Sequence, residues 1–304
     1  MSDSSVEGRV ASAARPSRVV SWTPWIFVVL WSTGFVVARY ATNDTGPLTF
    51  LAVRMVFAAA ILAMVAAARR APLVDRKLVP WVVLAGMGMH VLYLGGVFVA
   101  IDRGLPAGVS ALIAGLHPVL TALVSKRFLG ERLIRIQWIG VGLGFAGVIA
   151  VVVDRLLTHS SGITWMTMGA SAVSVIGMTG GTLVQRKKCS TMPLLWGTVL
   201  QYAAAAVVFM VLAVAWEHWD FTITRESVFA LLWAVFVLSI AAVLLMLWLL
   251  QRRAASQVTS LFFLTPALSA VEGAILFGER LGALALVGLA ISLLGVAFVT
   301  RKAI

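Results

Sequence analysis

Long apolar runs follow one another along almost the whole chain, and each is long enough to cross a lipid bilayer. The hydrocarbon core of a membrane is about 30 Å thick and needs roughly 20 apolar residues in a helix, which satisfies its own backbone hydrogen bonds. The connections are short, and none is long enough for a soluble domain. The pattern predicts ten transmembrane helices, at about 22–41, 47–68, 78–100, 105–125, 136–153, 163–185, 193–216, 227–250, 255–277 and 281–300.

The composition excludes a soluble globular protein. Charged residues make up 12% of the chain and hydrophobic residues 61%, whereas a soluble domain carries about 25% charged residues. The net charge of +12 does not indicate a nucleic-acid partner, because the cations form short clusters between apolar runs and no single basic face. We therefore expect a lipid bilayer as the partner and no nucleic acid. The single cysteine, Cys189, permits no disulfide and no cysteine-based metal site, and we expect no cofactor.

The lysine and arginine residues predict which side of the membrane each connection faces. Short loops rich in Lys and Arg stay in the cytoplasm. With the N-terminus placed inside, every cytoplasmic connection is basic, and most of the 24 cations fall on that side. We therefore expect a multi-pass protein of the bacterial inner membrane with both termini cytoplasmic. Residues 1–21 are expected to form a disordered tail and residues 301–304 a short C-terminus.

The second half of the chain repeats the first. A shift of 148 residues aligns AGLHPVLTALVSKRFLGERL with FFLTPALSAVEGAILFGERL, so that Pro118 falls on Pro266 and one GERL run on the other. The matches predict a first five-helix repeat over 22–153 and a second over 163–300. Because five is odd, the second repeat must enter the membrane upside down. Inverted repeats enclose a binding site near the midplane and can alternate its access, so this arrangement favours a transporter.

Three segments resemble the EamA-type drug/metabolite transporter superfamily: WSTGFVVARYATNDTGPLTFLAVRMVFAAAILAM (31–64), HPVLTALVSKRFLGERLIRIQWIGVGLGFAGVIAV (117–151) and TPALSAVEGAILFGERLGALALVGLAISLLGVAFV (265–299). The resemblance covers nearly the whole chain. It implies an all-helical membrane fold with five helices in each half, and a small-molecule substrate. In length and layout the chain is similar to the YddG-like aromatic amino acid exporters. The superfamily also includes carriers of cationic drugs, sugar phosphates and nucleotide sugars, so the substrate class stays open.

Two prolines, Pro118 and Pro266, lie near the middle of the fourth and ninth predicted helices. A proline frees the carbonyl four residues earlier, here those of Ala114 and Phe262. In lipid, such a carbonyl needs a partner or a water-lined cavity. We interpret the prolines as symmetry-related kinks at the substrate site and hinge. Kinks that neighbouring helices satisfy are the alternative.

Polar side chains at mid-membrane depth are the candidates for substrate binding, because such groups are costly in lipid and usually face a cavity or another helix. His90 and Tyr93 are three residues apart and share one face of an α-helix. Together with His117 they are suited to a small zwitterion or a planar solute. A hydrogen-bonded contact that locks the third and fourth helices together is the alternative. The weaker candidates are Thr265, which occupies the position equivalent to His117, and Trp31, Thr179 and Thr182.

Two charged residues, Arg54 and Glu272, lie inside predicted helices. At 1.5 Å per residue, both lie roughly 9–11 Å below the outer end of their helix. Either charge alone would cost about 3 kcal/mol on insertion scales. Matching depth and opposite sign predict a salt bridge, which is either structural or a gate that breaks in one conformation. A carboxylate site at Arg54 is a further alternative, and Glu272 and the two histidines are the candidates for proton coupling.

Glycines recur in the fifth and tenth predicted helices, at Gly140, Gly144, Gly147, Gly288 and Gly295. Small residues let helices approach closely in a membrane. The pattern predicts close packing within the chain or, alternatively, a homodimer through these two helices.

No catalytic or nucleotide-binding motif occurs in the sequence. It contains no G-x-x-x-x-G-K-[ST] loop, no HExxH motif and no paired carboxylates inside the predicted helices. The helices are also too apolar for the continuous polar lining of a channel. We therefore expect a secondary transporter and no enzyme. It would export amino acids, aromatic ones among them, or similar small organic metabolites by alternating access. The alternatives are a carrier of another solute class, a channel or an integral membrane enzyme.

Overall fold

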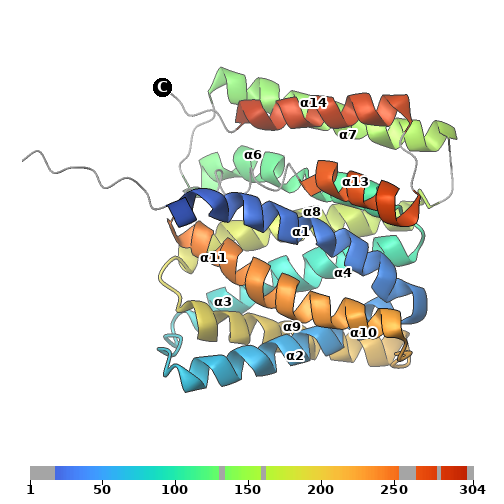
Figure 1. Ribbon diagram of the computed structural model, residues 1–304. Helices are drawn as coiled ribbons and strands as arrows, with labels where there is room; N and C mark the ends of the chain where they lie inside the picture. The colour runs from blue at the N-terminus through green and yellow to red at the C-terminus, as the bar shows by residue number, and fades with distance from the viewer. Residues whose placement is uncertain (1–17, 130–133, 159–161, 253–264, 279–281, 300–304) are drawn as a thin grey trace, which may run out of the picture.

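The computed structural model describes residues 18–129, 134–158, 162–252, 265–278 and 282–299. These segments form a bundle of helices (Figure 1). Their order is α1 (Arg18–Asp44), α2 (Pro47–Ala68), α3 (Val79–Gly86), η1 (Met87–Leu92), α4 (Tyr93–Asp102), α5 (Ala107–Ala114), α6 (His117–Leu129), α7 (Arg135–Thr158), α8 (Trp165–Lys188), α9 (Leu194–Trp216), α10 (Arg225–Leu232), η2 (Trp233–Ala242), α11 (Val243–Arg252), α13 (Thr265–Phe277) and α14 (Ala283–Val299).

Within these segments, six helices are long and apolar enough to cross a membrane. They are Trp25–Asp44, Pro47–Ala68, Val79–Asp102, Trp165–Lys188, Leu194–Trp216 and Arg225–Gln251, and shorter apolar helices cover Ala107–Thr121 and Ala283–Gly295. The all-helical membrane fold is therefore confirmed. The count of ten spans stays a prediction. The terminal tails up to residue 17 and from residue 300, the whole first GERL run, the second GERL run except Gly278, and the start of the ninth predicted helix lie outside the described residues.

The third helix of each predicted repeat contains a π-helical segment. η1 joins α3 to α4, and η2 joins α10 to α11. A shift of 147 residues moves η1 to 234–239, which lies inside η2. Because a π turn bonds residue i to i+5, it changes which side chains share a helix face, and such turns are frequent at functional sites. No pattern in the sequence predicted these π-helical segments.

Equivalent helices of the two predicted repeats run in opposite directions, as α1 and α8 do in Figure 1. α2 and α9 show the same relation at their ends. The N–H of Gly46, just before α2, donates to the carbonyl of Asp220, just after α9, over 3.0 Å, so the start of α2 lies beside the end of α9. α2 has 22 residues and so ends roughly 33 Å away, at 1.5 Å per residue. We call the end of the bundle that holds residues 217–224 the Glu217 end, and the end that holds residues 69–78 the Asp75 end.

Contacts between the two halves hold the bundle together. α2 packs along α9, and α7 packs along α14, and each of these pairs joins a helix of the first half to one of the second. α8 lies along the helix formed by α3, η1 and α4, and α1 lies against α10, η2 and α13. In Figure 1 the α7–α14 pair forms one edge of the bundle and the α2–α9 pair the other. α1, α4, α5, α8 and α13 lie between these two pairs.

Glycines bring α7 and α14 into close contact. A Cβ atom on Gly147 would collide with the carbonyl oxygen of Gly288, and one on Gly295 would lie 2.6 Å from the carbonyl oxygen of Gly140. No side chain fits at these positions, because real Cβ contacts are not that short. The glycine pattern thus serves packing within the chain, which is the first of the two interpretations drawn from the sequence.

Candidate functional site

The fourth predicted helix is interrupted near its middle. α5 ends at Ala114 and α6 begins at His117, with a two-residue turn that starts at Gly115. Pro118 is the second residue of α6, where its missing N–H costs no helical hydrogen bond. This two-residue turn therefore divides the predicted helix into α5 and α6 at the place where the sequence predicted a kink.

The second half has the corresponding proline at the corresponding place. Pro266 is the second residue of α13, and Phe262, whose carbonyl was expected to be freed, lies outside the described residues. The two proline regions touch, because a Cβ atom on Gly115 would lie 2.9 Å from Cγ of Pro266. The end of α5 and the start of α13 therefore lie directly against each other.

The carbonyl of Ala114, which the break leaves without its helical partner, lies 3.1 Å from Nδ1 of His117. This contact is a hydrogen bond when Nδ1 carries the proton. The carbonyl of His117 in turn accepts hydrogen bonds from Thr121 Oγ1 at 2.8 Å and from Thr179 Oγ1 at 3.2 Å. The predicted site residues His117 and Thr179 are thus brought together, and they satisfy the backbone around the break.

A small cavity of about 30 Å³ lies between α1, α2, α4 and η2. A buried water needs about 15 Å³ of such space, so the cavity has room for one or two waters and none for an organic solute. Binding of a solute therefore requires the surrounding helices to separate. The lining residues are Trp31, Gly34, Phe35, Arg54, Tyr93, Leu94, Val97, Phe98 and Leu238.

Two predicted site residues, Trp31 and Tyr93, close one side of this cavity. Trp31 Nε1 donates a hydrogen bond to the Tyr93 hydroxyl over 3.3 Å. Both residues also line a narrow slot, together with Gly115 at the helix break and the buried side chain of Thr265. The structure therefore brings Trp31, Tyr93 and Thr265 together, and their role in substrate binding stays a prediction.

His90 does not share this cavity with Tyr93. Its ring meets the ring of Tyr202 edge-on, with centroids 4.8 Å apart, and it is absent from the lining of both the cavity and the slot. The expectation of a shared face assumed an α-helix, but His90 lies in η1, where the wider turn rotates it away. Thr182, on α8, is buried and likewise lines neither space.

The predicted salt bridge between Arg54 and Glu272 is not formed in this conformation. Arg54 Nε donates to Ser239 Oγ over 2.8 Å, and Glu272 Oε1 accepts from Ser32 Oγ over 2.7 Å. The sequence fixes the depth of a residue along its helix but not which side chain it meets on a neighbouring helix. A pair that forms only in another conformation stays a prediction.

Sequence reasoning missed two polar residues beside the cavity. Tyr202 donates its hydroxyl to the carbonyl of Ser239 over 2.5 Å, while the Ser239 hydroxyl accepts from Arg54. Both residues are buried. The signal that could have found them is the one used for His90, namely a polar side chain inside a long apolar run.

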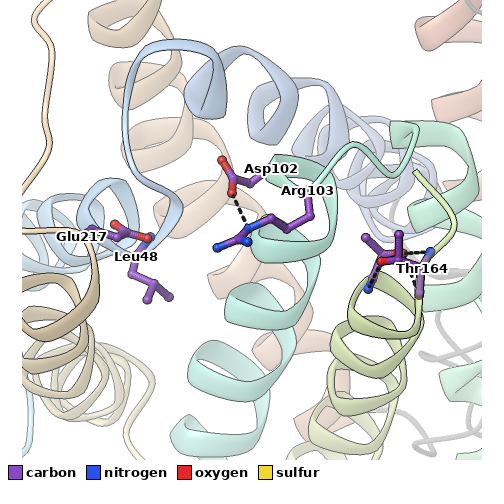
Figure 2. Close-up of polar contacts among 6 residues, drawn as sticks. Leu48, Asp102, Arg103, Thr164 and Glu217 are labelled. Carbon is purple, nitrogen blue, oxygen red and sulfur yellow. Dashed lines mark hydrogen bonds and ion pairs between the residues drawn. The ribbon is translucent and has the colours of Figure 1, made fainter. Parts of the chain in front are cut away.

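The Glu217 end carries a polar cluster that joins the two halves (Figure 2). The Glu217 carboxylate accepts hydrogen bonds from the N–H groups of Leu48 at 2.9 Å and Thr49 at 2.7 Å, and so caps the N-terminus of α2. Asp102 and Arg103 form an ion pair of 3.3 Å beside it. A hollow of about 660 Å³ at this end is lined by Asp102, Arg103 and Glu217, among others.

A second large hollow opens beside α1. This crevice of about 570 Å³ lies between α1, α10, η2 and the end of α13, with Arg225 and Glu226 among its lining residues. Thr33 lines the crevice, whereas its neighbour Gly34 lines the central cavity. Trp233 donates its Nε1–H to Thr33 Oγ1 over 2.9 Å across the crevice. α1 therefore forms the wall between the crevice and the cavity.

Both halves of the chain match the same protein family. The model of the EamA-like transporter family matches over residues 22–153 and again over 162–301. The chain belongs to the EamA-like transporter family. The resemblance to the drug/metabolite transporter superfamily is thereby confirmed, and the similarity to YddG-like exporters within it stays a prediction.

Curated relatives cover nearly the full length. An uncharacterized transporter, YvbV, of Bacillus subtilis is 28% identical over 90% of this chain and 89% of its own. A probable amino-acid metabolite efflux pump of Escherichia coli is 26% identical over 89% of this chain and 91% of its own. A probable terminal-alkyne amino-acid exporter of Streptantibioticus cattleyicolor is 23% identical over 92% and 93%. The chain is therefore similar throughout to membrane transporters.

A solved structure supports the fold. One crystal structure of a chain that is 18% identical superposes with a TM-score of 0.69 and covers 93% of this chain and 96% of its own. At this identity the likeness concerns the fold alone.

Proposed function

We propose that this protein is a secondary transporter that exports amino acids, aromatic ones among them, or similar small organic metabolites across the bacterial inner membrane by alternating access. The observation that carries the proposal is the position of the central cavity. Residues of both family copies line it, Leu238 from the second and the others from the first, and the helix break lies next to it. Transporters with internal repeats bind their substrates at such places, beside discontinuous helices.

The size of the cavity supports an access cycle. In this conformation the cavity is too small for an organic solute, while two hollows of about 570 and 660 Å³ open at or toward the Glu217 end. A substrate would reach the cavity when α1 moves away from α4 on one side. The contact of Gly115 with Pro266 is the point about which the broken helices would turn.

The proposed topology has ten membrane spans in two inverted repeats, over 22–153 and 163–300, with both termini in the cytoplasm. The Asp75 end would then face the cytoplasm, because its connections are rich in Lys and Arg. Leu73 and Ile223 are 74% and 79% exposed at the two ends and serve as labelling positions. In a Cys189→Ala background, an impermeant thiol reagent should label Ile223→Cys in intact cells and Leu73→Cys only after permeabilisation. Labelling of both from the same side would contradict the inverted topology.

The substrate class is proposed from two observations. Aromatic rings line the cavity, and relatives from Escherichia coli and Streptantibioticus cattleyicolor are named as exporters of amino acids or their metabolites. A carrier of a cationic drug, sugar phosphate or nucleotide sugar is the alternative within the superfamily. A channel or a membrane enzyme is the alternative outside it.

Transport by the purified protein in liposomes tests the proposal. The solutes are labelled aromatic, aliphatic and basic amino acids, a quaternary cation and a sugar phosphate. We expect saturable uptake and counterflow of at least one amino acid, reduced by Tyr93→Ala and unchanged by Trp165→Ala. Trp165 is the matched control because it is 95% exposed at the outer surface of the bundle. Unsaturable flux would indicate a channel, and uptake of the cation or sugar phosphate alone would exclude amino acids.

A homodimer through α7 and α14 also stays a proposal. The glycines of these helices face each other within the chain, so a dimer would use their outward sides, where Ile149 and Leu294 are exposed. Light scattering of the protein in detergent would measure the mass, and a monomer there and in nanodiscs would exclude the dimer.

A further inference from the structure

Arg54 is a buried cation in an apolar setting. It lies in α2, is 3% exposed, and lines the central cavity. The lining residues around it are aromatic or aliphatic, apart from the hydroxyl of Tyr93 and the indole N–H of Trp31. The charge therefore faces a cavity that offers it little polar compensation.

The hydrogen bonds of Arg54 leave most of its donors unused. A guanidinium group has five N–H donors in a planar fork. Its Nε donates to Ser239 Oγ, and the carbonyl of the same serine accepts a hydrogen bond from the Tyr202 hydroxyl. In the part of the chain that the structure describes, the Nη donors have no hydrogen-bond acceptor, and no carboxylate lies within ion-pair distance of Arg54. Glu272, the carboxylate that the sequence placed at a similar depth, accepts a hydrogen bond from Ser32.

An arginine in this state destabilises the folded protein. The reason is that a buried charge loses its hydration, and no counterion among the described residues compensates for that loss here. The Ser239 hydroxyl accepts a hydrogen bond from Nε and orients the guanidinium, but it supplies no negative charge. A bound anion would supply it, and the planar fork of arginine matches a carboxylate with two parallel hydrogen bonds.

We propose that Arg54 binds the carboxylate of the transported solute, and that this solute is an organic monocarboxylate with an apolar or aromatic body. The proposal rests on the proposed transport function and names its substrate class. Phe35, Phe98 and Leu238 would contact the body, and Tyr93 and Trp31 its polar edge. Among the described lining residues no acidic side chain is present to hold an ammonium group. Solutes whose amine is acylated are therefore expected to bind at least as well as free amino acids, and cations are excluded.

Binding to the purified protein in nanodiscs tests this assignment. The probes are 3-phenylpropionate and N-acetylphenylalanine, each compared with its own uncharged amide, which has almost the same shape. We expect each acid to bind at least tenfold more tightly than its amide. Arg54→Gln should abolish the difference, and Arg54→Lys, which keeps the charge but loses the fork, should retain a part of it. Arg69→Gln is the control, because Arg69 is exposed at the other end of the same helix.

Four outcomes would overturn the assignment. Equal binding of acid and amide to the wild type, or binding of neither probe pair, would show that Arg54 does not select a carboxylate. A second measurement is the thermal unfolding midpoint without ligand. It should stay or rise in Arg54→Gln, because the variant removes an uncompensated buried charge, whereas a marked fall would make Arg54 a structural residue. Saturable amino-acid transport that Arg54→Gln leaves intact would refute this assignment alone, while absence of any flux in the wild type would refute the proposed function.

Discussion

Trp31 and Tyr93 stack across the centre of the bundle, with their ring centroids 6.2 Å apart and a hydrogen bond of 3.3 Å from Trp31 Nε1 to the Tyr93 hydroxyl. Trp31 belongs to α1, and Tyr93 begins α4 directly after the π-helical segment. The pair therefore connects α1, which separates the crevice from the cavity, to α4, which lines the cavity. Any separation of α1 from α4 must break this contact.

Removing the hydroxyl of Tyr93 tests the role of this contact. A hydrogen bond contributes about 1 kcal/mol net, which corresponds to roughly a fivefold change in an equilibrium constant. We expect Tyr93→Phe to change the KM for uptake by up to this factor and Tyr93→Ala, which also removes the ring, to change it more. Initial uptake rates in liposomes would measure both. Identical KM values in the two variants and the wild type would exclude Tyr93 from the path of the solute.

Close packing of η1 on α8 depends on glycine. A Cβ atom on Gly177 would lie 2.8 Å from the carbonyl oxygen of Gly88, whereas one on Gly180 would meet nothing within 4 Å. Gly177→Ala should therefore destabilise the protein by about 1–3 kcal/mol through overpacking. Gly180→Ala, three residues away on the same helix, should stabilise it by up to about 1 kcal/mol. Thermal unfolding in detergent would measure both, and equal midpoints would contradict the observed helix contact.

Glu272 should couple energetically to Ser32 and not to Arg54. Residues in one hydrogen bond usually show a coupling energy of about 0.5–3 kcal/mol, and residues without shared partners show less. Double-mutant cycles with Glu272→Gln, Ser32→Ala and Arg54→Gln, read by unfolding stability, would measure the two couplings. A larger coupling of Glu272 to Arg54 would mean that the salt bridge forms in the conformation that predominates in solution.

The cap that Glu217 provides should contribute to stability. Its carboxylate bonds the N–H groups of Leu48 and Thr49 at the positive end of α2. Glu217→Ala should lower stability by about 0.5–2 kcal/mol, the usual range for loss of a helix cap. Glu226→Ala is a comparison, because Glu226 is exposed in the first turn of α10 and should lose only the weaker interaction of a charge with a helix end. A larger loss for Glu226→Ala in thermal unfolding would contradict this order.

The thiol of Cys189, which follows α8, should react slowly in the folded protein. Burial raises the pKa of Cys189 from 9.0 to about 11, and only the thiolate attacks alkylating reagents. Alkylation at pH 8 should therefore be slow in the native state, quicken as the pH rises toward 11, and be fast after denaturation. Because the thiol has the lower pKa in the unfolded state, it loses its proton there at a lower pH than in the folded state. The contribution of Cys189 to stability is therefore constant below pH 9 and is lost as the pH rises above it. Equal alkylation rates before and after denaturation would contradict the observed burial.

Parts of the candidate site followed from local properties of the sequence. Pro118 cannot donate in a helix interior, so a disturbance near Ala114 was predictable. That the disturbance is a two-residue turn, with the ring of His117 on the carbonyl of Ala114, depended on side-chain placement in the turn. The pairing of His90 with Tyr93 failed for a related reason, because the π-helical register of η1 has no signature in the spacing of the residues.

The sequence by itself determined the membrane class, the two-copy organisation and the family of this protein. The order of the residues alone is enough to show hydropathy, the positions of Lys and Arg, and internal repetition. Only the tertiary structure decided which polar groups meet. Arg54 bonds Ser239 at a separation of 185 residues and Glu272 bonds Ser32 at 240. The choice between such partners depends on how helices rotate and pack against one another, which no local pattern encodes.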